Sequence, residues 1–129
     1  MKKTIIGMYV FSALLIGVCS IPSKISYIKP PEPPRTDKQA ILEYISFYAE
    51  KHAVSEITMQ RVIACESGYK HTAIGDGGNS YGLVQIHLPS HPTITKEQAT
   101  NPLFAVEFLA ENLADGKGKL WTCYRKLIG

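Results

Sequence analysis

The sequence carries little excess charge of either sign. Its 129 residues include 14 Lys and Arg against 11 Asp and Glu, which gives a formal net charge of +3. Loss of the leader at residues 1–20 would lower this charge to +1, because Lys2 and Lys3 are removed and all 11 acidic residues stay. Domains that bind nucleic acid usually have a strongly basic face or tail. We therefore expect no nucleic acid as the main partner.

The sequence also has few cysteines, a single tryptophan and no internal repeat. Of the three cysteines, Cys19 lies in the leader, which leaves Cys65 and Cys123. An even number of cysteines in an exported chain favours one disulfide. Closing so long a loop contributes roughly 4 kcal/mol in the chain-entropy model.

Residues 1–20 are typical of an export signal. Two lysines precede an uncharged stretch that runs from Thr4 to Ser20, and small residues follow Val18. The stretch falls just short of the roughly 18–20 residues that span a bilayer, so a membrane anchor at residues 4–20 is the alternative. Lipid attachment at Cys19 is disfavoured because Val18 stands where such signals usually have Gly or Ala. Either way we expect an exported protein that is periplasmic, cell-wall-associated or extracellular.

Residues 21–35 form a Pro-rich linker in our interpretation. Five prolines within this range disfavour a helix and favour an extended chain. The remaining residues, 36–129, are enough for one small domain, which we expect to be monomeric.

Helical signals dominate residues 36–129 and predict a mainly α-helical domain of the α+β type. Thr36 and Gln39 are spaced for a capping box at the start of a first helix. Apolar residues then recur at helical spacing: Ala40, Ile41, Tyr44, Ile45, Tyr48 and Ala49. A second helix is expected from the N-cap Ser55, with Val54 and Met59 as a hydrophobic staple, to Gly68.

The second half of the domain contains turns and shorter helices. Residues 69–80 are rich in Gly and predict a loop or a short β-hairpin. Thr95 and Gln98 are spaced for a capping box, and Asn101-Pro102 opens a longer helix that ends before Gly116. Four residues are expected on the core face of that helix: Leu103, Val106, Ala110 and Leu113.

Glu66 stands out because it lies in the last turn of the second predicted helix. The negative end of the helix dipole and the apolar neighbours Val62 and Ile63 both disfavour an ionised carboxylate. Such a Glu can hold a proton near neutral pH and act as a general acid. A solvated Glu at a helix end is the alternative.

Two motifs follow one another at this point. Cys65-Glu66-Ser67-Gly68 is followed, after the Gly-rich loop, by Ser-Tyr-Gly-Leu-Val-Gln-Ile at residues 80–86. This order resembles the paired signature of the soluble lytic transglycosylases and their relatives in the lysozyme superfamily: Glu-Ser-Gly at a helix end, then Ser-x-Gly-Leu-x-Gln-Ile. Asn101-Pro102 resembles the opening of the family's next helix, so the resemblance covers roughly residues 62–113.

The resemblance implies a lysozyme-like fold, with the Gly-rich loop or hairpin beside the catalytic helix. It also implies cleavage of peptidoglycan glycan strands between N-acetylmuramic acid and N-acetylglucosamine, with no cofactor. Glu66 corresponds to the catalytic acid, which then accepts the proton of the sugar's 6-hydroxyl as a 1,6-anhydro ring closes. Ser80, Tyr81 and Gln85 match the segment that lines the saccharide groove. Gly82 would permit close approach of the backbone to substrate or to the second helix.

The chain departs from the family at its end. The usual Ala-Tyr-Asn-x-Gly segment is absent, and residues 121–125 read Trp-Thr-Cys-Tyr-Arg instead. Tyr124 is the candidate replacement for the family's late tyrosine. Trp121 can stack on a sugar, but a single Trp in a small domain is more often part of the core.

Several alternatives remain open. A lysozyme-type hydrolase needs a second carboxylate, for which Asp76 is the candidate unless it is merely a turn residue. A non-catalytic peptidoglycan-binding module is a further alternative. A thiol enzyme would pair Cys65 with His71 or His87, although Cys65 lies away from a helix start, where a thiolate is stabilised.

We expect no metal site. His87 and His91 have a suitable spacing, but Pro89 interrupts any helix between them, which favours exposed loop residues. His52 and His71 show no ligand pattern.

Overall fold

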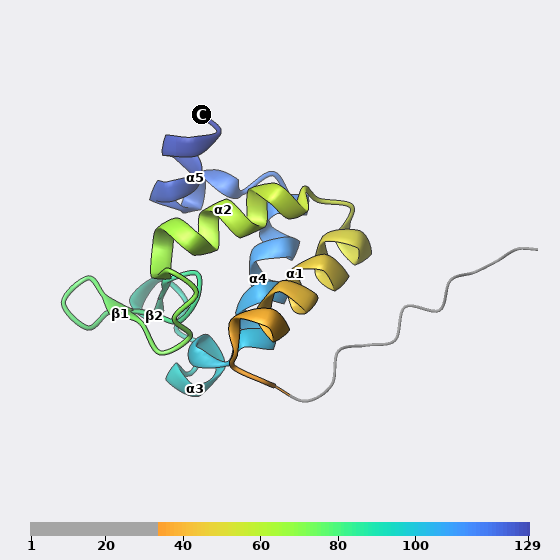
Figure 1. Cartoon of the computed structure of the whole chain (residues 1–129). Coiled ribbons are helices and arrows are strands. Elements are labelled where there is room, and N and C mark those ends of the chain that lie inside the picture. The colour runs from red at the N-terminus through yellow and green to blue at the C-terminus, as the bar shows by residue number, and fades with distance from the viewer. Residues whose placement is uncertain (1–33) are drawn as a thin grey trace, which may run out of the picture.

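The computed structural model describes residues 34–129 (Figure 1). The signal or anchor expected at residues 1–20, and the linker up to residue 33, lie outside the described residues. The described part is mainly helical, with a small three-stranded antiparallel sheet. No helix within it is long and apolar enough to cross a membrane.

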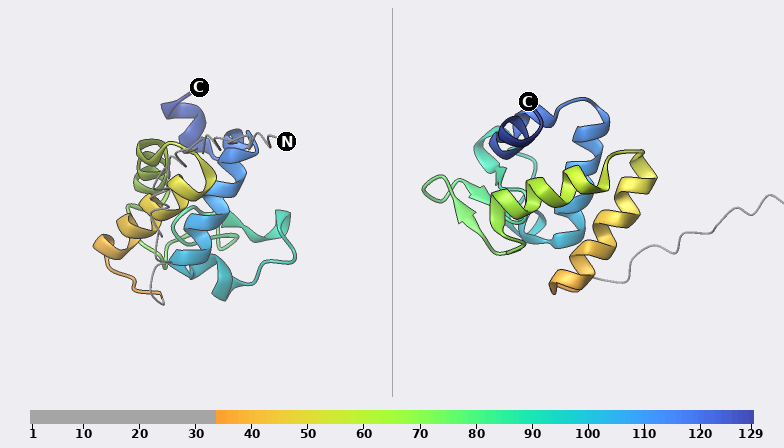
Figure 2. Two further views of the ribbon diagram at one scale, coloured as in Figure 1. Left: turned by 90° about the vertical axis from the view of Figure 1, so that its right-hand side faces the viewer. Right: turned by 45° about the horizontal axis from the view of Figure 1, so that its top comes forward.

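The elements follow one another in the order expected of one small domain. They are α1 (Lys38–His52), α2 (Glu56–Ser67), β1 (Ile74–Gly75), β2 (Ser80–Tyr81), β3 (Ile86–His87), the 3-10 turn η1 (Leu88–Ser90), α3 (Lys96–Thr100), α4 (Pro102–Ala114), the 3-10 turn η2 (Gly118–Leu120) and α5 (Thr122–Leu127). Figures 1 and 2 show the sheet beside the C-terminal end of α2.

The core lies where α1 packs against α4 and α2. All six apolar residues expected on the inner face of α1 are buried: Ala40, Ile41, Tyr44, Ile45, Tyr48 and Ala49. Val62 and Ile63 of α2 are fully buried in the same cluster. Of the predicted staple, Met59 belongs to the cluster and Val54 packs against it. The helical spacing of the sequence therefore identified the core of the first two helices.

The helix caps agree with the sequence except at the start of α1. Its N-cap is Asp37, whose carboxylate accepts from the N–H of Ala40 at 3.0 Å, so the prediction of Thr36 was wrong by one residue. Asp is a better N-cap than Thr, because its side chain competes more strongly for the free N–H groups. Ser55 caps α2 as predicted, and α2 ends at Gly68 with a φ of 58°.

The first described residues are attached to α1. The backbone N–H of Arg35 donates to the hydroxyl of Tyr44 at 2.8 Å, and the Arg35 guanidinium pairs with Glu43. The sequence placed Arg35 in the linker. These contacts tie it to the domain, so the ordered packing begins before residue 36.

Helix α4 begins as predicted but buries a different face. The side chain of Asn101 accepts from two backbone N–H groups of the first turn, and Pro102 is the first helical residue. The buried residues are Pro102, Ala105, Val106, Leu109 and Ala110. Leu103 and Leu113, which the sequence placed inward, are half-buried. The helix is apolar around most of its circumference, so periodicity alone could not choose the face.

The Gly-rich segment forms the predicted hairpin, and a third strand extends it. Strands β1 and β2 pair through Ile74 with Tyr81 and Gly75 with Ser80, and β2 pairs with β3. Residues 76–78 all have positive φ, which matches the Asp-Gly-Gly composition of the turn. The sheet is thus a meander of two-residue strands.

The C-terminal residues form a helix that the sequence did not predict. Helix α5 packs against α2, which places the end of the chain across the catalytic-helix candidate (Figure 1). Six residues are too few for a periodicity signal, and tertiary contacts decide such short helices.

Candidate active site

The carboxyl group of Glu66 is held through one of its two oxygens. Glu66 is half-buried in the last turn of α2, and Oε1 accepts from the backbone N–H of Cys123 at 3.1 Å. Cys123 is the second residue of α5, where N–H groups have no partner within their own helix. Oε2 accepts no hydrogen bond from residues 34–129. The carboxyl group is therefore oriented on one side and available on the other.

A disulfide lies directly beside this hydrogen bond. Cys65 and Cys123 are bonded, with their Cα atoms 5.9 Å apart, which confirms the expected pairing. Because Cys65 precedes Glu66 and Cys123 supplies the N–H, the bridge keeps α5 at the carboxyl group. A bonded sulfur is no nucleophile, so the arrangement does not support the thiol-enzyme alternative.

Ser80 and Asp76 interact with each other inside the hairpin. Ser80 is 1% exposed, and its hydroxyl donates to the carboxylate of Asp76. Asp76 itself is exposed and occupies the turn with a φ of 50°. The sequence placed Ser80 in the saccharide groove. In the structure its hydroxyl holds the turn and fixes the direction of the Asp76 carboxylate, and the groove assignment stays a prediction.

Tyr81 and Gln85 lie on the two sides of the β2–β3 turn. The Tyr81 hydroxyl donates to the carbonyl of Gly78 at 2.7 Å, and the ammonium group of Lys96 lies 4.9 Å from its ring centre. Gln85 has a φ of 51°, and its amide donates to the Gly82 carbonyl at 3.0 Å. Gln85 is half-buried and lines a pocket, so it is a predicted groove residue that reaches a cavity.

Gly82 permits a close approach, but to a different helix than expected. A Cβ at this position would lie 1.9 Å from the carbonyl oxygen of Ala99 in α3. The close approach is thus to α3 and not to the second helix, whereas an approach to substrate stays a prediction. Gly82 also has a φ of 80°, which L-residues rarely adopt. The glycine of the motif thus fixes the sheet against α3.

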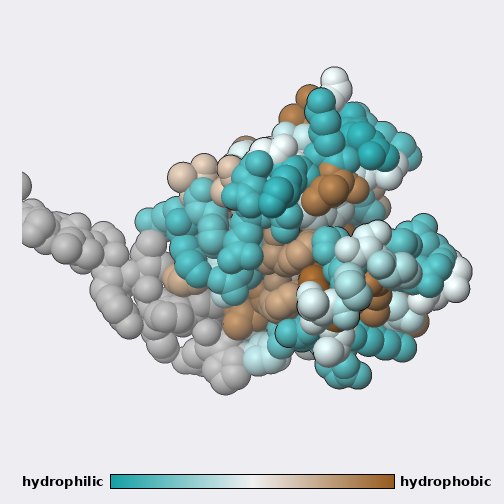
Figure 3. Space-filling model, turned by 180° about the vertical axis from the view of Figure 1, so that it is seen from behind, coloured by the Kyte–Doolittle hydropathy of each residue, from teal (hydrophilic) through white to brown (hydrophobic). Residues whose placement is uncertain are grey.

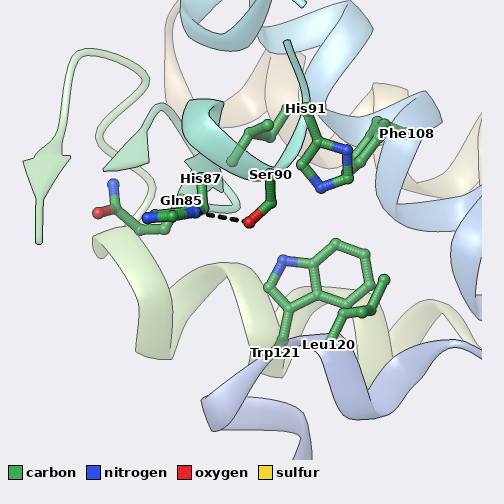
Figure 4. Close-up of a pocket in the computed structure, with 8 residues that line it drawn as sticks. Gln85, His87, Ser90, His91, Phe108, Leu120 and Trp121 are labelled. Carbon is green, nitrogen blue, oxygen red and sulfur yellow. Dashed lines mark hydrogen bonds between the residues drawn. The ribbon is translucent and has the colours of Figure 1, made fainter. Parts of the chain in front are cut away.

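A pocket of about 130 Å³ opens between the sheet, η1, α4 and the segment before α5 (Figure 4). Its lining combines aromatic and polar side chains: Gln85, Ile86, His87, Ser90, His91, Phe108, Leu120 and Trp121. Aromatic faces and hydrogen-bonding tips together suit a ligand with both apolar and polar faces. Glu66 does not belong to this lining. Trp121, however, lies two residues before Cys123, which holds Glu66.

Trp121 belongs to the core and also forms one wall of the pocket. It is 5% exposed, and its indole N–H donates to the Val84 carbonyl at 2.8 Å. Its ring meets Phe108 edge to face, with centres 6.1 Å apart. The core assignment favoured by the sequence is confirmed. Figure 3 shows, on the face opposite to that of Figure 1, apolar surface in a hollow between hydrophilic regions.

The two histidines of residues 87–91 are half-buried in this pocket and are not the exposed loop residues that we expected. Nδ1 of His87 lies 2.8 Å from the hydroxyl of Ser90, and the His91 ring packs edge to face on Phe108. Pro89 does interrupt regular structure, as predicted, but η1 turns both rings toward one cavity (Figure 4). This is the feature that sequence reasoning missed.

Tyr124 packs on the backbone of η2. A Cβ on Gly118 would lie 2.6 Å from the Tyr124 ring, so a larger residue there would push this ring aside. Tyr124 is half-buried and is not part of the pocket lining. Gly118, three residues before Trp121, was the available sequence signal for this contact.

No family model, no curated protein and no solved structure matches this chain.

Proposed function

We propose that the protein cleaves peptidoglycan glycan strands between N-acetylmuramic acid and N-acetylglucosamine, with Glu66 as acid and base, by the lytic transglycosylase route. The observation that carries this proposal is the Glu66 carboxyl group, with one oxygen held by the Cys123 N–H and the other without a protein partner. The lysozyme-like character of the fold is part of the same proposal. It is supported by a helical body with a small antiparallel sheet beside the end of α2.

The chemistry requires one carboxyl group. Protonated Glu66 donates its proton to the glycosidic oxygen as the bond from that oxygen to C1 breaks. The resulting carboxylate accepts the proton of the 6-hydroxyl while O6 bonds to C1, which closes the 1,6-anhydro ring and restores the acid. Atoms balance without water. The hydrogen bond from Cys123 keeps the carboxyl group in place through both proton transfers.

The pocket lined by Trp121 offers side chains that can bind sugars. Gln85 and His87 offer amide and imidazole groups, and Trp121 and Phe108 offer aromatic surface. Such groups bind the hydroxyl and N-acetyl groups of a saccharide and pack against its apolar ring face. Peptidoglycan as the partner, and an exported or wall-associated location, belong to this proposal.

Two observations support alternative functions, a hydrolase and a non-catalytic module. The Asp76 carboxylate is exposed on the hairpin and oriented by Ser80, as a second carboxylate of a hydrolase would need to be. Glu66 also caps the first turn of α5, which gives it a structural role that a non-catalytic module would retain.

The test of the proposal is Glu66→Gln in the whole chain, assayed on purified peptidoglycan. The amide oxygen still accepts from the Cys123 N–H, so circular dichroism and Tm should remain near those of the wild type. Proton donation is lost, and the rate should fall by about 10²–10⁴-fold. Glu50→Gln, at an exposed position of α1, is the matched control and should keep full activity. Full activity of Glu66→Gln would refute the catalytic role of Glu66 and leave only its structural role at the first turn of α5.

The products distinguish transglycosylase from hydrolase. Mass spectrometry of the released muropeptides should show 1,6-anhydro ends, lighter by one water than reducing ends. Asp76→Asn should leave the rate within about threefold, because a single-carboxylate route needs no second base. Reducing ends alone, together with loss of activity in Asp76→Asn, would establish the hydrolase instead.

A further inference from the structure

Three side chains with metal-binding atoms meet where α1 ends against α4. His52 is the last residue of α1, and Glu107 and Glu111 lie one turn apart on α4. One potential ligand atom from each residue lies within 4.8 Å of the other two. Among residues 34–129, this is the only place where three or more His, Cys, Asp or Glu side chains lie close enough together to share one metal ion.

Within the described part of the chain, the imidazole of His52 lacks a hydrogen-bond partner on one nitrogen. Its Nε2 atom is buried, and among the described residues it has no hydrogen-bond partner. It is the one buried side-chain nitrogen or oxygen in that part of the chain with this property. Buried polar groups are almost always paired, because leaving one unpaired costs about 1–3 kcal/mol. The same imidazole offers a ligand atom within 4.8 Å of the two carboxylates.

The charges around His52 favour a cation. Two carboxylates and the negative end of the α1 dipole converge there. The Glu111 side chain is exposed, and its carboxylate forms no hydrogen bond or ion pair with residues 34–129. Glu107 is engaged by Lys51 at 2.7 Å and by the Tyr48 hydroxyl at 3.2 Å. The Lys51 pair is half-exposed, and such pairs contribute about 0–1 kcal/mol, so Lys51 can give way to an ion.

We propose that His52, Glu107 and Glu111 bind one divalent transition-metal ion of the Zn²⁺ type. Imidazole nitrogen together with carboxylate oxygen selects such ions over Mg²⁺ and Ca²⁺, which prefer oxygen alone. Ligand atoms around tetrahedral zinc lie roughly 3.4 Å apart, as follows from bonds of about 2.0–2.2 Å. The present separations, all within 4.8 Å, therefore need to shorten by up to about 1.4 Å, and the exposed Glu111 side chain is free to rotate toward the other two.

The ion has a structural role. Its ligands come from α1 and α4, the two helices that form much of the core, so it clamps them at one end. His52 lies just before α2 begins, whereas Glu66 lies near its far end, roughly 15 Å along the helix axis. Tyr48 is not a ligand of the ion, but its hydroxyl donates to Glu107 and so orients that ligand.

The test is a Zn²⁺ titration of the whole chain after treatment with a chelator. Calorimetry should give one site, and ZnCl₂ should raise the Tm, since the ion binds the folded state. His52→Gln and Glu111→Gln should each weaken the Kd for Zn²⁺ at least about 100-fold, because each loses a ligand. His71→Gln, at a half-buried histidine outside the cluster, is the matched control and should change it less than about threefold.

Two results would overturn the site. The first is the absence of any Tm increase for the wild type at about 1 mM Zn²⁺. The second is an unchanged Kd in both ligand variants, which would mean adventitious binding elsewhere. Circular dichroism of the metal-free variants checks folding. For any variant that folds poorly, NMR of the wild-type imidazoles decides: Nε2 of His52 should shift on Zn²⁺ binding, and an unshifted His52 rejects the site.

Discussion

Tyr48 illustrates how a polar side chain is accommodated in the core. It is 6% exposed, its ring lies against those of Phe47 and His52, and its hydroxyl donates to Glu107. Burial, followed by the negative charge of Glu107, raises the pKa of Tyr48 to about 12. The hydroxyl therefore keeps its proton well above the pH at which a free tyrosine ionises.

This shift predicts a loss of stability in alkali. An unfolded tyrosine ionises near pH 10, whereas folded Tyr48 does so near 12. Between these values the unfolded chain holds fewer protons, so the free energy of unfolding falls as pH rises from about 10 to 12. Tyr48→Phe should flatten this decline in urea titrations across that range. Burial also raises the pKa of Tyr69, so the flattening should be partial, and Tyr48→Phe combined with Tyr69→Phe should flatten it further. An unchanged slope in the double variant would contradict the shift.

Single residues also mark the limit of what the sequence reveals. Helix signals placed Glu66 in the last turn of α2 without reference to any partner. The Cys123 N–H that orients it is 57 residues away, and no local pattern encodes a hydrogen bond of that kind. The same holds for His52, whose neighbours Glu107 and Glu111 come from a helix that begins 50 residues later.

At the scale of elements, the sheet is positioned by one glycine. Gly82 starts the turn between β2 and β3 and lies against the Ala99 carbonyl of α3. Gly77, in the preceding turn, also has a positive φ of 62° but has open space around it. Both glycines are required by their positive φ, but only Gly82 is also required by close packing. Comparing them therefore distinguishes the two effects.

The pair gives a matched prediction. Gly77→Ala should lower the free energy of unfolding by about 1 kcal/mol, which is the cost of a left-handed alanine. Gly82→Ala adds a backbone clash and should cost at least about 3 kcal/mol. Urea unfolding of both variants measures the difference. Equal losses would mean that the sheet can move away from α3 at little cost.

Elements with local signals were predicted well, and those without were not. The cap residues Ser55, Gly68 and Asn101 lie where the sequence placed them, since a cap is a short-range interaction. The buried face of α4 was misplaced because apolar side chains surround that helix. Strand β3 and helix α5 have two and six residues, and their pairing with β2 and α2 decides them.

At the scale of the whole molecule, the end of the chain is tied to its middle. The bridge from Cys65 to Cys123 encloses 58 residues of sequence separation and includes the whole sheet, α3 and α4. Its existence was predicted from the cysteine count together with the expectation of export, but the consequence for Glu66 was not. Because α5 is short, the bridge and the α2 contacts are what keep the Cys123 N–H beside the carboxyl group.

This arrangement predicts that stability and activity depend together on the disulfide. Replacing both cysteines by serine should lower the free energy of unfolding by up to about 4 kcal/mol, because the unfolded chain regains the entropy of an open loop. Activity at a temperature where the variant remains folded should also fall, since α5 is then free to leave Glu66. A reductant should reproduce both effects in the wild type and change nothing further in the double-serine variant. Urea unfolding and the peptidoglycan assay measure the two losses. If stability falls while activity per folded molecule stays the same, the Cys123 N–H is not needed to orient Glu66.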